Sequence, residues 1–239
     1  MIKTIALDFG GVLAYPVSGN WFIPYNLFKI VGFKNSVKLM IKKNRLNDAF
    51  KKANVYLNEN HLLFTEDEEY EQFKHFYKTV FNELKMKVTD SIIDRISQEI
   101  VYNDYKMKLY DDVSDIIKRL KLTYRVVIIS DTWPSLRRFL KNNGILELLD
   151  GIIMSCNYNK TKETTELFEI AVRECNLKPD ECIFVDDSAG NLKNAEKTGF
   201  KPILMDRGNT KENAEFPVIH SLDELKNFIE ISDACAEQT

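Results

Sequence analysis

TIALDFGG, at residues 4–11, is a short apolar run that ends in one acidic residue and two glycines. Two later stretches repeat the pattern, RVVIISD at residues 125–131 and CIFVDD at residues 182–187. The apolar part of each stretch is continuous rather than alternating, which is typical of strands covered on both faces in a parallel sheet. Weaker apolar runs occupy residues 151–154, 202–205 and 217–219.

Helical patterns lie between these runs. Apolar residues recur at helical spacing over residues 113–120, 135–142, 166–175, 192–198 and 222–231. Strands that alternate with helices indicate βαβ units and a parallel sheet. The sequence therefore predicts an α/β fold, a doubly wound, Rossmann-like parallel sheet with helices on its faces.

One long segment breaks this alternation. From about Pro16 to Tyr105 there is no convincing strand, and the segments 33–53, 68–84 and 92–101 show helical spacing of apolar residues. We expect an all-helical domain at residues 18–105, inserted into a Rossmann-like domain formed by residues 1–17 and 106–239.

Composition narrows the choice of partners. The 239 residues carry 33 Lys and Arg against 36 Asp and Glu, a net charge of −3, so no overall basic field attracts nucleic acid. The apolar runs are far shorter than the ~18 residues that a membrane span needs, and the start of the chain does not resemble a signal peptide. We expect neither a nucleic-acid nor a membrane partner.

The four cysteines bear on the location of the protein, and one basic segment bears on its partners. The cysteines form no CxxC pair, which favours reduced thiols and a cytoplasmic protein. The basic segment Lys38–Lys52 is either a patch for an anionic partner or the solvated face of an amphipathic helix, and the second interpretation is the more ordinary one.

Candidate functional residues follow three of the predicted strands. In open parallel sheets, ligands bind beyond the carboxyl ends of the strands, where this chain places Asp8, Ser130–Asp131 and Asp186–Asp187. Carboxylates gathered there repel one another unless a hard cation shares them, and an oxygen-only ligand set favours Mg²⁺. Gly10 leaves backbone N–H groups open to an anion, and Lys162 can add a positive charge.

Each of these residues also has a purely structural interpretation. An aspartate that closes a strand is often only part of a turn, Asp186-Asp187-Ser188 can cap the next helix, and Lys162 can be a surface lysine. Their occurrence together, in order and at matching strand ends, favours a site.

Four segments that contain these residues resemble the motifs of the haloacid dehalogenase-like hydrolase superfamily. The segments are residues 8–13, 128–132, 155–168 and 184–191, and the resemblance covers the predicted α/β part of the chain. It implies that the helical insertion is a mobile cap, matched by its position and not by its sequence.

The resemblance also implies an activity and a set of roles. We expect an Mg²⁺-dependent phosphatase that hydrolyses a small phosphorylated metabolite through an aspartyl-phosphate on Asp8. In the family's pattern, Ser130, Lys162 and the backbone N–H groups of Phe9, Gly10 and Asp131 bind the transferring phosphoryl group. The metal ligands are then Asp8, the Gly10 carbonyl, Asp187 and Asp186, the last directly or through water, while Asn191 orients the acidic loop.

Two positions depart from the family's pattern. Gly10 stands where phosphatases of this kind usually carry a second aspartate, the general acid and base, and Glu163 stands where a proline often follows the lysine. Two alternatives therefore stay open: a metal-independent 2-haloacid dehalogenase, and a non-catalytic member that binds a phosphorylated ligand or a protein. The sequence assigns neither the substrate nor the oligomeric state.

Overall fold

The structure is a computed structural model that describes residues 1–211 and 214–229. The chain forms two compact units. The core unit comprises Met1–Tyr15, Leu109–Thr132 and the chain from Arg137 onward, and the helical unit comprises Pro16–Lys108 and Trp133–Leu136. Residues 133–136 group with the helical unit, although they lie in the part of the sequence that is expected to form the α/β domain.

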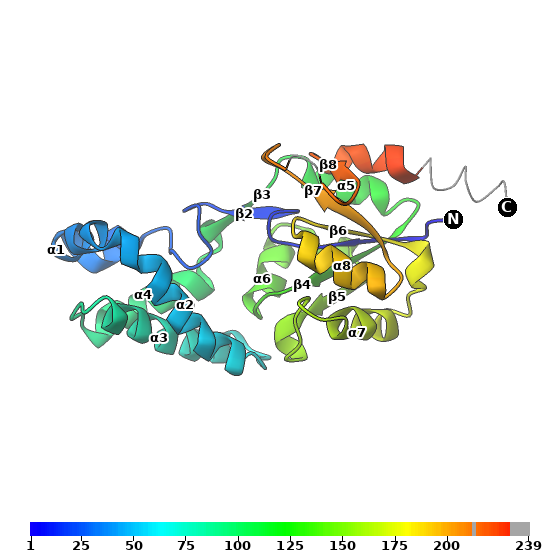
Figure 1. Cartoon of the computed structure of the whole chain (residues 1–239). Helices are drawn as coiled ribbons and strands as arrows, with labels where there is room; N and C mark the ends of the chain where they lie inside the picture. The colour runs from blue at the N-terminus through cyan, green and yellow to red at the C-terminus, as the bar shows by residue number, and fades with distance from the viewer. Residues whose placement is uncertain (212–213, 230–239) are drawn as a thin grey trace. The chain divides into compact units, whose positions relative to one another are not determined.

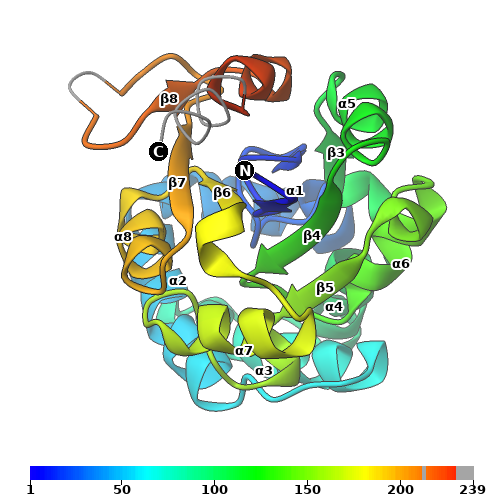
Figure 2. The same ribbon diagram turned by 90° about the vertical axis from the view of Figure 1, so that its right-hand side faces the viewer.

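The core unit is built on a six-stranded sheet whose order is β5-β4-β1-β6-β7-β8. All five pairings of neighbouring strands are parallel (Figure 2). The strands are β1 (Thr4–Leu7), β4 (Arg125–Ser130), β5 (Gly151–Met154), β6 (Cys182–Asp186), β7 (Lys201–Met205) and β8 (Val218–Ile219). The three central strands are almost fully buried, which explains their continuous apolar sequence. The predicted doubly wound α/β fold is confirmed.

Helices cover both faces of this sheet (Figures 1 and 2). They are α5 (Val113–Leu120), α6 (Ser135–Asn142), α7 (Glu166–Glu174) and α8 (Ala189–Lys197). On one face α7 and α8 enclose an aromatic cluster, in which Phe168 of α7 meets Phe184 of β6 edge to face with ring centroids 5.1 Å apart. Helix α8 begins three residues before the predicted start because Ser188 caps it by accepting a hydrogen bond from the Asn191 N–H.

The last predicted helix, at 222–231, is described only in part. Leu222–Glu224 forms a 3₁₀ turn and residues 225–229 are helical, while residues 230 and 231 lie outside the described residues. Cys235 lies outside them as well, and the other three cysteines are buried free thiols.

Two short strands were not predicted. β2 (Ala14–Pro16) and β3 (Met107–Leu109) form a two-stranded sheet, and the boundary between the two units falls inside both strands. Strands of three residues are too short to carry an apolar period.

The helical unit contains α1 (Leu27–Ile41), α2 (Lys43–Glu59), α3 (Glu66–Glu83) and α4 (Asp90–Tyr102) (Figure 1). The expected helix-like segment 33–53 is divided between α1 and α2, because the chain turns at Lys42. Helix α3 starts at a capping box, in which Thr65 and Glu68 each accept a hydrogen bond from the other's backbone N–H. Phe76 of α3 stacks on Phe50 of α2 with centroids 5.8 Å apart at the centre of this unit's apolar core.

In the described part of the chain, no helix combines the length and apolarity that a membrane crossing requires.

Candidate active site

The order of the strands brings the predicted acidic residues together in the core unit. β1 lies between β4 and β6, and Leu7 at its end pairs with Ile128 and with Val185. Asp8 follows Leu7 and Asp186 follows Val185, so these two aspartates stand side by side where the parallel strands end. A sheet is open to ligands at this edge, next to the strand where the winding reverses.

Asp187 completes a cluster of three carboxylates. One oxygen from each of Asp8, Asp186 and Asp187 lies within 4.8 Å of the other two. Asp8 and Asp186 are buried, whereas Asp187 is exposed. Oxygen donors alone, at this separation and with an excess of negative charge, fit a hard divalent cation such as Mg²⁺.

Lys162 is the buried cation of the cluster. Its Nζ lies 2.6 Å from Asp8 Oδ1 and 2.7 Å from Asp186 Oδ2, and only 2% of the side chain is exposed. The loop is fixed on both sides of the residue, because the Lys162 N–H donates to the Asp131 carboxylate and the Lys162 carbonyl accepts from Asn194 Nδ2 at 3.0 Å. The interpretation of Lys162 as a surface lysine is wrong.

The environment shifts the pKa values of these groups. Burial raises the pKa of Asp8 to about 7, with Lys162 opposing the shift and Asp186 adding to it. Burial by itself would lower the pKa of Lys162, but the carboxylates of Asp8, Asp186 and Asp131 outweigh it and raise this pKa. Lys162 therefore stays charged, and its positive charge favours the ionised form of Asp8.

Asp186 is held by donors from its own loop. Its Oδ1 accepts from the Ser188 N–H at 2.7 Å, and Asn191 Nδ2 lies 3.2 Å and 3.1 Å from its two oxygens. Lys162 Nζ also donates to Oδ2, so both oxygens of Asp186 already accept hydrogen bonds within the protein. Asp187 consequently presents the more open carboxylate to a cation.

The turn after Asp8 makes room for Asp187. Gly11 has a φ of +73°, and a Cβ built on it would lie 2.3 Å from Asp187 Oδ2. The turn closes tightly, because the Gly11 N–H donates to the Ala14 carbonyl at 2.8 Å and Gly10 forms a bridge with Ala14. Phe9 is buried edge to face against Phe139, which anchors the turn to the core unit. Ser130, at the end of β4, hydrogen-bonds the Asp8 carboxylate.

Comparison with protein families gives a match to the haloacid dehalogenase-like hydrolases over residues 2–199. This chain belongs to that family. It is a hydrolase, as the resemblance of its motifs implied.

Relatives within the family differ in what their names describe. A D-ribitol-5-phosphate phosphatase of Bacteroides thetaiotaomicron is 24% identical in an alignment of 101 residues. The alignment covers 39% of this chain and about half (49%) of the relative. A magnesium-bound hydrolase of the family from Bacillus subtilis is 14% identical, with a TM-score of 0.63 over 95% of this chain and 98% of that one. The L-2-haloacid dehalogenase of Xanthobacter autotrophicus is 16% identical, with a TM-score of 0.64 over 96% and 99%. These two structural likenesses carry the fold alone.

Three residues that support the loops of the carboxylate cluster were not predicted from the sequence. Asp206 accepts from the N–H groups of Thr210 and Lys211, and the Lys211 ammonium then reaches the Asp187 carbonyl. Arg207 donates a hydrogen bond to the Val12 carbonyl and forms an ion pair with Asp112. These contacts stabilise the turn that carries Gly11. Asp206 follows an apolar strand as Asp8 does, and this signal could have identified it, whereas no local pattern marks Arg207 or Lys211.

Three other side chains that could donate a proton are held in ring contacts. Tyr15 packs on Tyr110 with centroids 5.0 Å apart, and His75 stacks on Tyr56 at 3.7 Å. His61 lies edge to face with Trp133 in the helical unit, and burial lowers its pKa.

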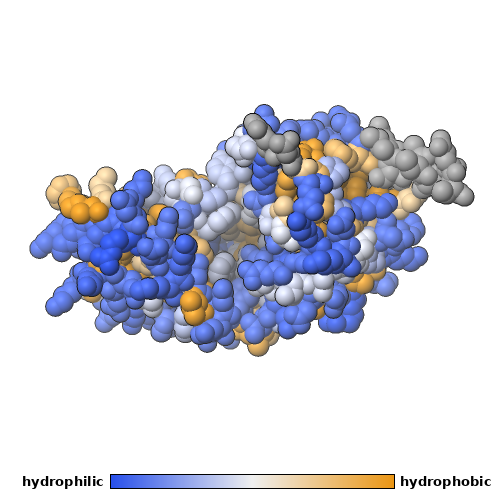
Figure 3. All heavy atoms as spheres, viewed as in Figure 1, coloured by the Kyte–Doolittle hydropathy of each residue, from blue (hydrophilic) through white to orange (hydrophobic). Residues whose placement is uncertain are grey.

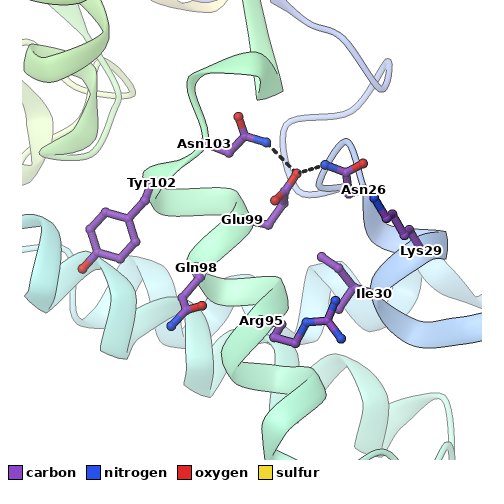
Figure 4. A pocket seen from close by; sticks show the side chains of 8 residues that line it. All are labelled: Asn26, Lys29, Ile30, Arg95, Gln98, Glu99, Tyr102 and Asn103. Carbon is purple, nitrogen blue, oxygen red and sulfur yellow. Dashed lines mark hydrogen bonds between the residues drawn. The ribbon is translucent and has the colours of Figure 1, made fainter.

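The helical unit has a separate cavity of about 490 Å³ between α1 and α4. Glu99 accepts hydrogen bonds of 2.6 Å from both Asn26 and Asn103, and Lys29 and Arg95 also line the cavity (Figure 4). Because Glu99 already accepts from two amide side chains, we interpret it as a structural residue. None of the predicted site residues lines this cavity.

Proposed function

We propose that this hydrolase is an Mg²⁺-dependent phosphatase that acts on a small phosphorylated metabolite. The observation that carries the proposal is the cluster of Asp8, Asp186 and Asp187, with Lys162 between two of its carboxylates. In the pattern that the motifs resemble, a dehalogenase has no acidic pair, so Asp186-Asp187 favours phosphoryl chemistry. The phosphatase named among the relatives supports the same choice.

In the proposed reaction, a carboxylate oxygen of Asp8 attacks phosphorus and the bond to the leaving oxygen breaks. The product is an aspartyl-phosphate, which water hydrolyses to inorganic phosphate, restoring the Asp8 carboxylate. Lys162, the Ser130 hydroxyl and the backbone N–H groups of Phe9, Gly10 and Asp131 would stabilise the charge on the phosphoryl oxygens.

The metal would be held by Asp8, Asp187 and the Gly10 carbonyl, with Asp186 acting through water because its own oxygens are engaged. Bound there, Mg²⁺ would supply positive charge that offsets the repulsion between the phosphate and the carboxylates. Asn191 would keep Asp186 oriented from the helix α8 side.

We further propose that the helical unit is the cap that excludes water and selects the leaving group. Residues 16–108 occupy the sequence position of such a cap, between the first and second motifs. Because one relative is a D-ribitol-5-phosphate phosphatase, sugar and alditol phosphates are the first substrates to test. We place the protein in the cytoplasm, where such metabolites and reduced thiols occur.

A substrate screen tests the proposal. Release of inorganic phosphate from a panel of phosphorylated metabolites should require Mg²⁺ and disappear with EDTA. The variant Asp8→Asn should retain the circular dichroism of the wild type but lose at least about a hundredfold in kcat, because an amide is a far poorer nucleophile than a carboxylate.

The same panel separates the two alternatives. Halide release from 2-haloacids that persists in EDTA would establish a dehalogenase instead. Binding of Mg²⁺ and phosphorylated compounds without turnover of any of them would mean a non-catalytic member of the family.

A further inference from the structure

Helix α1 leaves a strip of large apolar side chains uncovered. Gly32, with φ 75° and ψ 165°, interrupts the helix, and the part that follows carries Phe33, Val37, Met40 and Ile41. These four residues recur at the spacing i, i+4, i+7 and i+8, so they share one face. Their exposed fractions are 86%, 39%, 68% and 77%, and Figure 3 shows apolar spheres gathered over α1. We call them the apolar strip.

Every charged side chain in the segment that carries the apolar strip is positive. The chain from Asn26 to Asn47 has no acidic residue, and its six cations are Lys29, Lys34, Lys38, Lys42, Lys43 and Arg45, which we call the basic rim. Among the described residues none of the six has an ion-pair partner, although elsewhere in the helical unit Lys52 pairs with Glu83 and Lys74 with Asp94.

This combination distinguishes between possible partners. Five of the six cations are lysines, and lysine is depleted at protein–protein interfaces while arginine is enriched. A second copy related by a twofold axis would place one basic rim against another, and like charges repel. By contrast, helices that lie in the interface of a membrane combine lysines with an apolar face of aromatic and aliphatic residues.

We propose that α1 docks this protein reversibly on an anionic lipid surface. Phe33, Met40 and Ile41 enter the boundary between headgroups and acyl chains, and the rim lysines extend to the phosphate groups of the lipid. Such docking requires no membrane-spanning helix. It departs from the expectation of no membrane partner drawn from the sequence, which rested on the length of apolar runs and not on exposed faces.

Sedimentation with vesicles tests this proposal on the full chain. The protein should bind vesicles of phosphatidylcholine that contain about a third phosphatidylglycerol, and binding should weaken as salt is added. The triple variant Lys34→Gln, Lys38→Gln, Lys43→Gln should bind about a hundredfold more weakly, at about fivefold for each lysine. The double variant Phe33→Ser, Ile41→Ser should lose at least about tenfold.

Matched controls carry the same changes elsewhere. The triple variant Lys87→Gln, Lys118→Gln, Lys141→Gln alters the net charge equally, and Leu62→Ser with Leu122→Ser removes two other exposed apolar side chains. Both controls should bind like the wild type. All the altered residues are at the surface, so thermal unfolding should stay unchanged.

Three outcomes would overturn the proposal. One is the absence of sedimentation with anionic vesicles. Another is equal loss in the test and control triple variants, which would mean attraction by net charge alone. The third is a dimer, seen by sedimentation velocity without lipid and abolished by Phe33→Ser and Ile41→Ser, which would assign the strip to a second copy.

Discussion

At the scale of single residues, Gly11 is required for two separable reasons. Its φ of +73° is unfavourable for any residue with a Cβ, and its missing side chain leaves the space that Asp187 occupies. Gly144 has a similar φ of +67° but no atom within 4 Å of its missing Cβ. The two glycines therefore form a matched pair, in which only Gly11 adds a steric clash to the backbone cost.

We predict that Gly144→Ala lowers the free energy of unfolding by about 1–2 kcal/mol and leaves Mg²⁺ affinity unchanged. Gly11→Ala should cost at least as much stability and, by displacing the Asp187 carboxylate, weaken Mg²⁺ binding by tenfold or more. Urea unfolding in EDTA and titration calorimetry measure the two effects. Equal Mg²⁺ affinity in both variants would remove Asp187 from the metal site.

Gly10 raises a different question, because it stands where a general acid is usual. Without a dedicated acid, the leaving oxygen departs with little protonation, and the barrier should depend strongly on the leaving-group pKa. General acid catalysis typically contributes about 10²–10⁴-fold. We therefore predict that aryl phosphates and sugar 1-phosphates have much higher kcat/KM than alkyl monophosphates of similar size. A flat dependence, with chemistry rate-limiting, would mean that another residue donates the proton.

At the scale of elements, a buried carboxylate on α3 holds the start of α6. Glu69 is 1% exposed and accepts hydrogen bonds from the Ser135 N–H at 2.7 Å and from the Ser135 hydroxyl at 2.8 Å. A carboxylate at a helix N-terminus satisfies donors that the helix itself leaves unpaired. Burial nevertheless raises the pKa of Glu69, although the nearby Lys106 opposes this shift.

The raised pKa gives a pH dependence with a definite sign. Because the folded state favours protonated Glu69, its contribution to stability is complete below the ordinary pKa of 4.5 and is lost as the pH rises through the higher folded pKa. We predict that Glu69→Gln flattens this decline above pH 4.5, whereas Glu69→Ala, which leaves the Ser135 donors unpaired, costs about 1–3 kcal/mol in acid and less as the pH rises. Urea unfolding across pH checks this, with the exposed Glu59→Gln as control. An unchanged pH slope in Glu69→Gln would contradict the prediction.

The sequence predicted those elements whose pattern is local. The central strands and the helices 113–120 and 135–142 were found because burial imposes a continuous or periodic apolar pattern on a single segment. The strand-end acids were grouped correctly because parallel strands end at one edge, so Asp8 and Asp186 had to be neighbours.

What the sequence did not predict depends on contacts between distant segments. Nothing within Trp133–Leu136 indicates that these residues join the helical unit, because their partners, Glu69 and Gln72, are about sixty residues away. The support of the Gly11 turn by Arg207 is likewise a contact between distant segments, which local periodicity does not record.

At the scale of the whole molecule, the proposed metal site exists only in the folded sheet. Asp8, Asp186 and Asp187 are brought together only when β1 and β6 pair, so the unfolded chain offers no comparable site. A ligand that binds the folded state alone raises its stability by RT ln(1 + [L]/Kd), about 2.7 kcal/mol at a hundred times Kd. Cation binding at the proposed site should therefore be visible as folding stability, even with no substrate present.

We predict that Mg²⁺ raises the unfolding midpoint of the wild type relative to EDTA and that Asp187→Asn abolishes this increment. Partial burial of its carboxylate and repulsion from Asp186 raise the pKa of Asp187, although the residue as a whole is exposed. Because Asp187→Asn relieves this repulsion, its stability in EDTA should be equal to or above that of the wild type. Asp150→Asn is the matched control. Asp150 accepts from the Val126 N–H and pairs with the Lys121 ammonium at the opposite, amino ends of the strands. Replacing its charge with an amide should therefore lose about 1–2 kcal/mol in EDTA yet keep the full Mg²⁺ increment. Scanning calorimetry of the three proteins with and without Mg²⁺ measures both effects, and an increment that survives in Asp187→Asn would place the cation elsewhere.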